Sequence, residues 1–172
     1  MLIYFMDKVS IIIPAHNEGE RIEKTLEKYI FYFNELKQKK ILDFEIIIVL
    51  NACSDNTGDI VRKFKNKKLV ILDFVQGGKG FAITEGFKEG LRRNSDFIGF
   101  IDADGSTPPE AFYDLIRNLV GLDGVIADRW HKKSIVAKQA FLRQFLSRGY
   151  NFIIRSFFLL PYRDTQCGAK IF

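Results

Sequence analysis

The chain has 172 residues, which is enough for one domain with a sizeable core, and its 47% hydrophobic and 27% charged content is typical of globular proteins. No apolar run approaches the ~20 residues that span a bilayer, and residues 1–6 are too short for the core of a signal peptide. The two cysteines, Cys53 and Cys167, form no CxxC pair. They exclude a disulfide scaffold and indicate a reducing cytoplasm.

The positive charge is concentrated in one segment. Between Arg129 and Arg163 lie eight of the 26 Lys and Arg residues and no Asp or Glu. The rest of the chain has 18 cations against 21 anions, so the net charge of +5 combines +8 in this segment with −3 elsewhere. This asymmetry predicts an anionic partner for the segment.

Short apolar runs and helical patterns alternate along the first 128 residues. The apolar runs predict buried strands over 9–14, 44–50, 69–73, 97–101 and 124–128. One helical pattern follows the loop after the first strand and ends at about residue 40. Further helical patterns cover about 58–65, 81–93 and 108–120. This alternation predicts a doubly wound, mostly parallel α/β sheet flanked by helices, and we expect one domain over 1–172.

The loops after the first two strands carry turn and capping residues. Asn17 and Glu20 resemble a capping box for the first helix, and Asn56 or Thr57 is a candidate cap for the second. His16 and Glu18 follow the first strand directly. Roles in a binding site and roles in the turn are equally compatible with these two residues.

A glycine-rich stretch, Gln76-Gly-Gly-Lys-Gly80, follows the third strand and precedes a helix. Glycines there allow backbone N–H groups to approach a phosphate, and Lys79 adds a cation. The stretch is no Walker motif, because no Ser or Thr follows the lysine. A flexible surface loop is the alternative.

Asp102 and Asp104 follow the fourth strand, with the small Ala103 between them. On an extended segment these two side chains share one side, and ligands of parallel α/β sheets bind at the carboxyl ends of strands. Paired carboxylates favour a hard cation such as Mg²⁺ or Mn²⁺, which usually also takes a substrate phosphate. A solvated turn that caps the next helix is the alternative.

Residues 134–160 have an apolar-rich helical pattern with Arg143, Arg148 and Arg155 interleaved. A cationic amphipathic helix of this kind suits a membrane interface or an apolar ligand with an anionic head. The alternative is one or two core helices whose arginines face water.

Taken in order, these motifs resemble family 2 glycosyltransferases with the GT-A fold, and most of all the dolichyl-phosphate glucose and mannose synthases. The segment 11–18 resembles the family's opening strand and nucleotide loop, 77–80 its lysine–glycine segment, and Asp102-Ala-Asp104 its metal-binding DxD. The segment 164–170, Asp-Thr-Gln-Cys-Gly-Ala-Lys, resembles a motif of the dolichyl-phosphate β-glucosyltransferase branch.

The chain departs from the family pattern in two places. The paired aspartates usual after the second strand are replaced by Leu50 and Asn51, so a charge-assisted contact to the nucleotide is lost there. The chain also ends directly after the 164–170 motif, and we expect it to lack a C-terminal part that is usual in the family.

The resemblance implies an inverting transfer of glucose or mannose from a nucleotide sugar, UDP-glucose or GDP-mannose, to a polyprenyl or dolichyl phosphate. It implies Mg²⁺ or Mn²⁺ as cofactor, with Asp102, Asp104 and Ser106 as metal site. The residues implied to bind the nucleotide sugar are Pro14, Ala15, Asn17, Glu18, Asn51, Lys79, Asp102 and Ala103.

The resemblance also implies which residues act in the transfer step, namely Asp104, Asp164, Gln166 and Arg129. It implies an acceptor site made by Arg129, Arg143, Ser147 and Arg148. A lipid acceptor places the protein on the cytoplasmic face of a membrane as a peripheral protein.

Other functions remain open. A relative that only binds a nucleotide sugar or an anionic lipid is compatible with Asn51 and with the short C-terminus. A sugar nucleotidyltransferase is disfavoured, because Pro14-Ala-His-Asn-Glu18 stands where its glycine-rich signature would follow the first strand. Nucleic-acid binding ranks last, because the basic segment is too apolar to follow a phosphate backbone alone.

Overall fold

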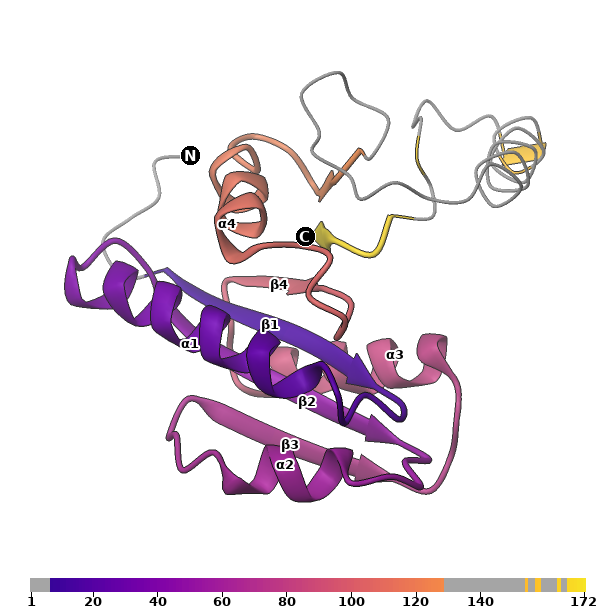
Figure 1. Ribbon diagram of the computed structural model, residues 1–172. Helices are drawn as coiled ribbons and strands as arrows, with labels where there is room; N and C mark the ends of the chain where they lie inside the picture. Colours follow the sequence, from indigo (N-terminus) through magenta and orange to yellow (C-terminus); the bar gives the residue numbers. More distant parts are fainter. Residues whose placement is uncertain (1–6, 129–153, 155–156, 159–163, 165–166) are drawn as a thin grey trace. The chain divides into compact units, whose positions relative to one another are not determined.

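The computed structural model describes residues 7–128, 154, 157–158, 164 and 167–172 (Figure 1). The chain divides into two units, Met1–Val125 with Ala169–Phe172, and Ile126–Gly168. In the second unit Ile154, Phe157 and Phe158 are helical, and the rest of the predicted 134–160 helical segment lies outside the described residues. The fold and the site below are those of the first unit.

Strands and helices alternate as predicted. In chain order they are β1 (Lys8–Ala15), α1 (Ile22–Gln38), β2 (Asp43–Asn51), α2 (Thr57–Lys63), β3 (Leu69–Phe74), α3 (Lys79–Arg92), β4 (Phe97–Phe100), α4 (Pro109–Arg117), β5 (Val125–Ile126) and β6 (Lys170–Ile171). The predicted strand over 124–128 is limited to two residues, and β6 was not predicted, since two residues carry no periodicity.

The strands form one sheet in the order β3-β2-β1-β4-β6-β5. β1 pairs in parallel with β2 and β4, and β2 pairs in parallel with β3, whereas β4 pairs antiparallel with β6. The predicted mostly parallel α/β sheet is therefore confirmed. Because β1 and β2 are central and covered on both faces, nearly all of their residues are buried, which explains their continuous apolar runs.

Helices cover both faces of this sheet (Figure 1). Alternate residues of β2 show the two layers: the Phe44 ring packs against Phe33 of α1, while Ile47 and Val49 lie in a cluster with Ala82 of α3. The helix α1 also contacts α2 and α4. Tyr29, Phe33 and Phe112 form an aromatic cluster between α1 and α4.

The helix α3 approaches β1 closely through a glycine. A Cβ at Gly86 would lie 2.5 Å from Cγ2 of the buried Ile12, which is closer than van der Waals contact allows. The absence of a side chain at Gly86 thus allows α3 to pack directly against β1.

The predicted side-chain caps are wrong, although Asn56 does lie at the N-cap of α2, one of the two positions predicted. Arg21, not Asn17, is at the N-cap of α1, and neither it nor Asn56 at the N-cap of α2 makes a side-chain capping hydrogen bond. The Asn17 Oδ1 instead accepts from the N–H groups of Ser54 (2.8 Å) and Asp55 (3.3 Å). A contact between the loops after β1 and β2 therefore replaces the local cap.

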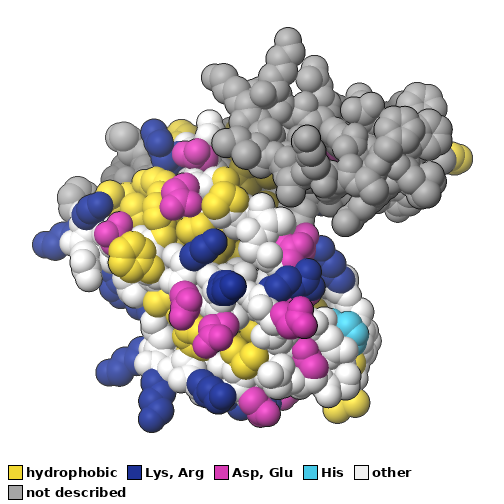
Figure 2. Space-filling model, in the orientation of Figure 1, with side chains coloured by type: hydrophobic (Ala, Val, Ile, Leu, Met, Phe, Trp, Pro, Cys, Tyr) yellow, Lys and Arg dark blue, Asp and Glu magenta, His cyan; other side chains and the backbone are white. Residues whose placement is uncertain are grey.

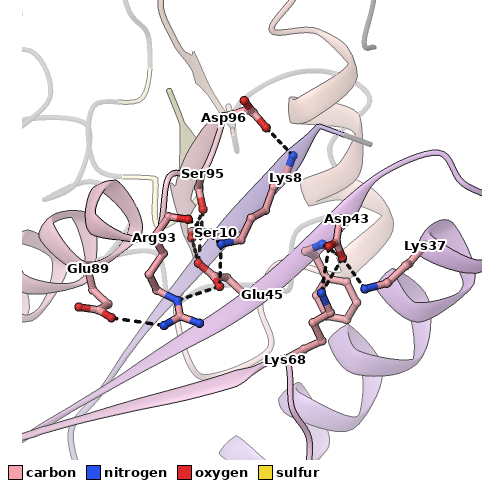
Figure 3. Close-up of polar contacts among 11 residues, drawn as sticks. Lys8, Ser10, Lys37, Asp43, Glu45, Lys68, Glu89, Arg93, Ser95 and Asp96 are labelled. Carbon is pink, nitrogen blue, oxygen red and sulfur yellow. Dashed lines mark hydrogen bonds and ion pairs between the residues drawn. The ribbon is translucent and has the colours of Figure 1, made fainter. Parts of the chain in front are cut away.

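A polar cluster lies at the amino ends of β1 and β2 (Figure 3). Glu45 is 3% exposed and accepts hydrogen bonds from Ser10 (2.7 Å) and Arg93 (2.9 Å), and Lys8 pairs with it at 3.0 Å. Burial by itself raises the pKa of Glu45, but these hydrogen bonds outweigh burial and keep the pKa below its usual value.

Asp43 forms a second ion cluster beside this one (Figure 3). Its carboxylate lies 2.7 Å from the ammonium of Lys68 and 2.9 Å from that of Lys37. Burial acts to raise the pKa of Asp43, yet the hydrogen bonds from Lys68 and Lys37 prevail and lower it from 3.8 to about 2.

The surface of the described part carries charges of both signs. Figure 2 shows Lys and Arg side chains interspersed with Asp and Glu on the displayed face, without a large patch of one sign. The basic segment from Arg129 to Arg163 lies almost wholly outside the described residues. Among the residues that are described, no helix is long and apolar enough to cross a membrane.

The Asp43 cluster predicts an acid-sensitive contribution to stability. Because folding lowers the pKa of Asp43, the stabilisation is complete above the usual value of 3.8 and is lost as the pH falls toward about 2. In urea unfolding, the loss of stability caused by Asp43→Asn should therefore shrink as the pH falls through this window. Asp59→Asn is the control, since Asp59 is 79% exposed and lies 3.9 Å from Arg62. A constant difference between wild type and Asp43→Asn would contradict this assignment.

Candidate functional site

A cleft of about 410 Å³ lies at the carboxyl ends of β1, β2 and β4 and at the start of α3. Each side of the cleft comes from a segment that follows a strand of the parallel sheet. Its lining residues are Pro14, His16, Glu18, Asn51, Gly77, Gly78, Lys79, Asp102, Ala103 and Asp104.

The two aspartates reach the cleft from a turn. β4 ends at Phe100, and the chain turns at Ala103 and Asp104, so the predicted extended geometry of this segment is wrong. Ala103 is buried, and its carbonyl accepts from the Thr25 hydroxyl at 2.9 Å. Ala103 and the two flanking carboxylates all line the same cleft.

Asp104 is oriented by the backbone that follows it. Its Oδ1 accepts a hydrogen bond from the Ser106 N–H at 2.9 Å. The Ser106 side chain is exposed, and Ser106 is not among the residues that line the cleft. The contact of Ser106 with Asp104 therefore runs through its backbone.

Asp102 is paired with a cation from the glycine-rich stretch. The ammonium of Lys79, the first residue of α3, forms an ion pair and hydrogen bond with the Asp102 Oδ1. The side chains of Lys79 and Asp102 are 55% and 29% exposed, so this pair is accessible from the cleft. Asp102 and Asp104 are therefore in different environments, since only Asp102 is neutralised by this lysine.

Asn51 joins three segments at the base of the cleft. It is 3% exposed, its Nδ2 donates to the Ala15 carbonyl at 2.9 Å, and its Oδ1 accepts from the Gly78 N–H at 3.2 Å. Both ends of the amide are thus used to connect the ends of β1 and β2 to the start of α3. The next residue, Ala52, has a φ of 50°, a left-handed conformation that costs a residue with a Cβ about 1–2 kcal/mol.

His16 is oriented by the backbone of Asn51. Its Nδ1 lies 2.8 Å from the Asn51 carbonyl oxygen, and since a carbonyl only accepts, Nδ1 carries the proton of this hydrogen bond. In the neutral ring, Nε2 is then a hydrogen-bond acceptor. His16 is exposed and lines the cleft, so its Nε2 is available to a ligand.

The structure brings together most of the residues predicted to bind the nucleotide sugar. Pro14, Glu18, Asn51, Lys79, Asp102 and Ala103 line the cleft, together with Asp104, which was predicted as a metal ligand. Ala15 is buried, with its carbonyl bonded to Asn51, and Asn17 is bonded to Ser54, so neither belongs to the lining.

The other predicted residues belong to the second unit. Asp164 is buried there, with 2% exposure, while Gln166, Arg129, Arg143, Ser147 and Arg148 lie outside the described residues. The cleft also contains His16, Gly77 and Gly78, for which the sequence left both a binding role and a loop or turn role open. Their positions directly after β1 and directly before α3 were the available signal.

The two cleft carboxylates are suited to a divalent cation bound together with a phosphate ligand. Mg²⁺ and similar hard cations are commonly held by one or two carboxylates plus substrate phosphates, rather than by an all-protein cage. In the described ranges, no group of three or more His, Cys, Asp or Glu side chains could hold a metal ion. The two carboxylates in the cleft fit a cation that is shared with a phosphate ligand.

The family of the chain follows from a comparison with models of known protein families. The model of glycosyl transferase family 2 matches residues 10–172. The chain belongs to glycosyltransferase family 2. Curated members of the family that it resembles include the dolichyl-phosphate beta-glucosyltransferases of Dictyostelium discoideum, 32% identical, and of Homo sapiens, 27% identical. These alignments cover 95% and 96% of this chain, and 53% and 54% of the relatives. The chain thus spans about half the length of these relatives.

Solved structures share the GT-A fold. Glucosyl-3-phosphoglycerate synthase from Mycobacterium tuberculosis, solved with UDP, superposes with a TM-score of 0.63 at 18% identity, over 95% of this chain and 56% of that one. S. aureus TarS 1-349 superposes with a TM-score of 0.55 at 24% identity, over 77% and 38% of the two chains. At these identities the likeness establishes the fold alone.

The bonds of Asn51 predict that Asn51→Asp is destabilising. A carboxylate at this position cannot donate to the Ala15 carbonyl and would place oxygen against oxygen. We expect urea denaturation at neutral pH to show a loss of about 1–3 kcal/mol in the free energy of unfolding.

Asn66→Asp provides the matched control. The Asn66 side chain uses its oxygen to accept from the Lys68 N–H at 2.9 Å, and aspartate retains that acceptor. Equal stability of Asn51→Asp and wild type would contradict the bridging role of Asn51.

Proposed function

We propose that this chain contributes the donor site of an inverting glycosyltransferase that moves a hexose from a nucleotide sugar to a polyprenyl or dolichyl phosphate. The main support for the proposal is that one cleft is lined by Asp102, Asp104, Lys79 and Asn51. The names of the curated relatives favour glucose, with UDP-glucose as the first donor to test and GDP-mannose as the second.

The cleft residues have distinct roles in this proposal. Asp102 and Asp104 would hold Mg²⁺ or Mn²⁺ together with the donor diphosphate, and such a cation would supply stabilisation of the negative charge on the leaving nucleoside diphosphate. Lys79 and the amino end of α3 provide positive charge for the phosphates. The ring of His16 lines the same cleft, held by the Asn51 carbonyl, and offers a further polar contact to the nucleotide.

The acceptor part of the proposal rests on the family resemblance. Arg129, Arg143, Ser147 and Arg148 would bind the phosphate of the lipid, and Asp164 and Gln166 would contact the sugar or position the acceptor. The charge of +8 between Arg129 and Arg163 supports an anionic lipid head. This arrangement would place the protein on the cytoplasmic face of a membrane.

The transfer itself needs little acid–base chemistry. An oxygen of the acceptor phosphate forms a bond to C1 of the sugar, while the bond between C1 and the β-phosphate oxygen breaks and the electron pair leaves with the nucleoside diphosphate. Because a phosphate oxygen is already deprotonated near neutral pH, no strong general base is required. Attack from the face opposite the leaving group inverts the anomeric centre.

A second candidate is a protein that binds the nucleotide sugar without transferring it. The engaged, uncharged amide of Asn51 favours this alternative, because the base then receives no charge-assisted bond from the end of β2. Transfer of labelled sugar to a polyprenyl phosphate distinguishes the two: donor binding with transfer supports the enzyme, and donor binding without transfer supports the binding protein.

Titration calorimetry with UDP-glucose and GDP-mannose, each with and without Mn²⁺, tests the donor site. One donor should bind in a metal-dependent way, and Asp104→Asn should weaken that binding by at least about tenfold, since the metal loses a charged ligand. Asp114→Asn is the control, because it removes a carboxylate on the exposed surface of α4. Absence of binding for both donors with Mn²⁺ would refute the proposed donor site.

A further inference from the structure

Lys79 already occupies one of the two carboxylates assigned to the metal. Its ammonium is bonded to the Asp102 Oδ1, whereas the Asp104 Oδ1 accepts the uncharged N–H of Ser106. In this state the positive charge that balances Asp102 is supplied by the chain itself. A divalent cation that binds both aspartates must displace this ammonium or lie beside it.

The two cations compete for the same carboxylate. A lysine ammonium close to a divalent ion is repelled by it, and both ions are attracted to Asp102. Bound alone, a divalent cation would therefore break the Lys79–Asp102 pair without a new partner for the lysine. The pair should weaken the binding of metal in the absence of a second anion.

A diphosphate removes this obstacle. Lys79 is half-exposed, is carried on a flexible four-carbon stem, and lies at the first position of α3 on the rim of the cleft. A diphosphate in the cleft brings an anionic partner to which the ammonium can move. Asp102 is then free for the metal at the moment when the diphosphate also offers oxygen ligands.

We propose that Lys79 is an exchangeable counter-ion, bonded to Asp102 in the empty cleft and to the diphosphate in the loaded one. The inference rests on the proposed donor site and adds to it a coupling between metal and diphosphate. Because such coupling is reciprocal, the metal tightens the diphosphate by the same factor by which the diphosphate tightens the metal. The cleft thus selects ligands that carry a diphosphate and rejects the free metal.

The test measures Mn²⁺ binding, followed by the electron paramagnetic resonance signal of free Mn²⁺, in the absence and presence of UDP. Lys79→Met keeps the length of the side chain and removes its charge. We expect this variant to bind Mn²⁺ alone about tenfold more tightly than wild type, and the enhancement of Mn²⁺ affinity by UDP to fall by about the same factor.

Two further variants test whether the effect depends on the position and on the charge of Lys79. Lys88→Met removes one positive charge from the exposed surface of α3, where Lys88 pairs with Glu85, and should leave both affinities unchanged. Lys79→Arg retains the charge and should keep Mn²⁺ binding weak in the absence of UDP.

Unchanged or weaker binding of Mn²⁺ alone by Lys79→Met would overturn the counter-ion role. This outcome is separate from failure of the donor site. Metal-dependent UDP binding combined with an unchanged Mn²⁺ affinity in Lys79→Met would reject the exchange while leaving the proposed function intact. Tighter Mn²⁺ binding in Lys79→Met without any effect of UDP would retain the competition at Asp102 but reject the diphosphate as the exchange partner.

Discussion

The buried amide of Asn51 is the constraint on which the cleft depends. Its two hydrogen bonds, to the Ala15 carbonyl and from the Gly78 N–H, join the ends of β1 and β2 to the start of α3. These bonds fix the backbone from which Lys79 reaches Asp102. They also explain how an uncharged residue can stand where the resemblance leads one to expect an aspartate: at this position the chain uses a donor as well as an acceptor, and an amide supplies both, whereas a carboxylate only accepts.

The two ends of the parallel strands are built from different chemistry. At the amino ends, Glu45 and Asp43 are surrounded by cations and hydroxyl groups of the chain, and their charges are fully compensated. At the carboxyl ends, the Ser106 N–H donates to Asp104, and Asp102 is paired with a lysine whose side chain is flexible. The permanent ion pairs thus stabilise the sheet at one edge, and the incompletely compensated charges are concentrated at the edge where ligands of α/β sheets bind.

Much of the fold could be predicted from the sequence, because buried central strands produce unbroken apolar runs such as the one in β2, and helices follow them with a 3.6-residue period. The caps could not be predicted, because Asn17 bonds to the loop after β2, a partner distant in the sequence. The turn at Ala103 was only the alternative to an extended segment, and its contact with the Thr25 hydroxyl of α1 is likewise distant in the sequence. Most cleft residues could be predicted, because they lie where a predicted strand ends or a predicted helix begins. The hydrogen bonds of Asn51 with Ala15 and Gly78 could not, because they join residues distant in the sequence.

The central claim is that Asp102 and Asp104 hold a divalent cation against the diphosphate of a nucleotide. The most direct measurement is anomalous X-ray scattering from crystals of the protein grown with UDP and Mn²⁺. The account predicts an anomalous peak within about 2.0–2.6 Å of carboxylate oxygens of Asp102 or Asp104, with the diphosphate as a further ligand. UDP bound elsewhere on the protein, or Mn²⁺ bound without contact to either aspartate, would contradict it.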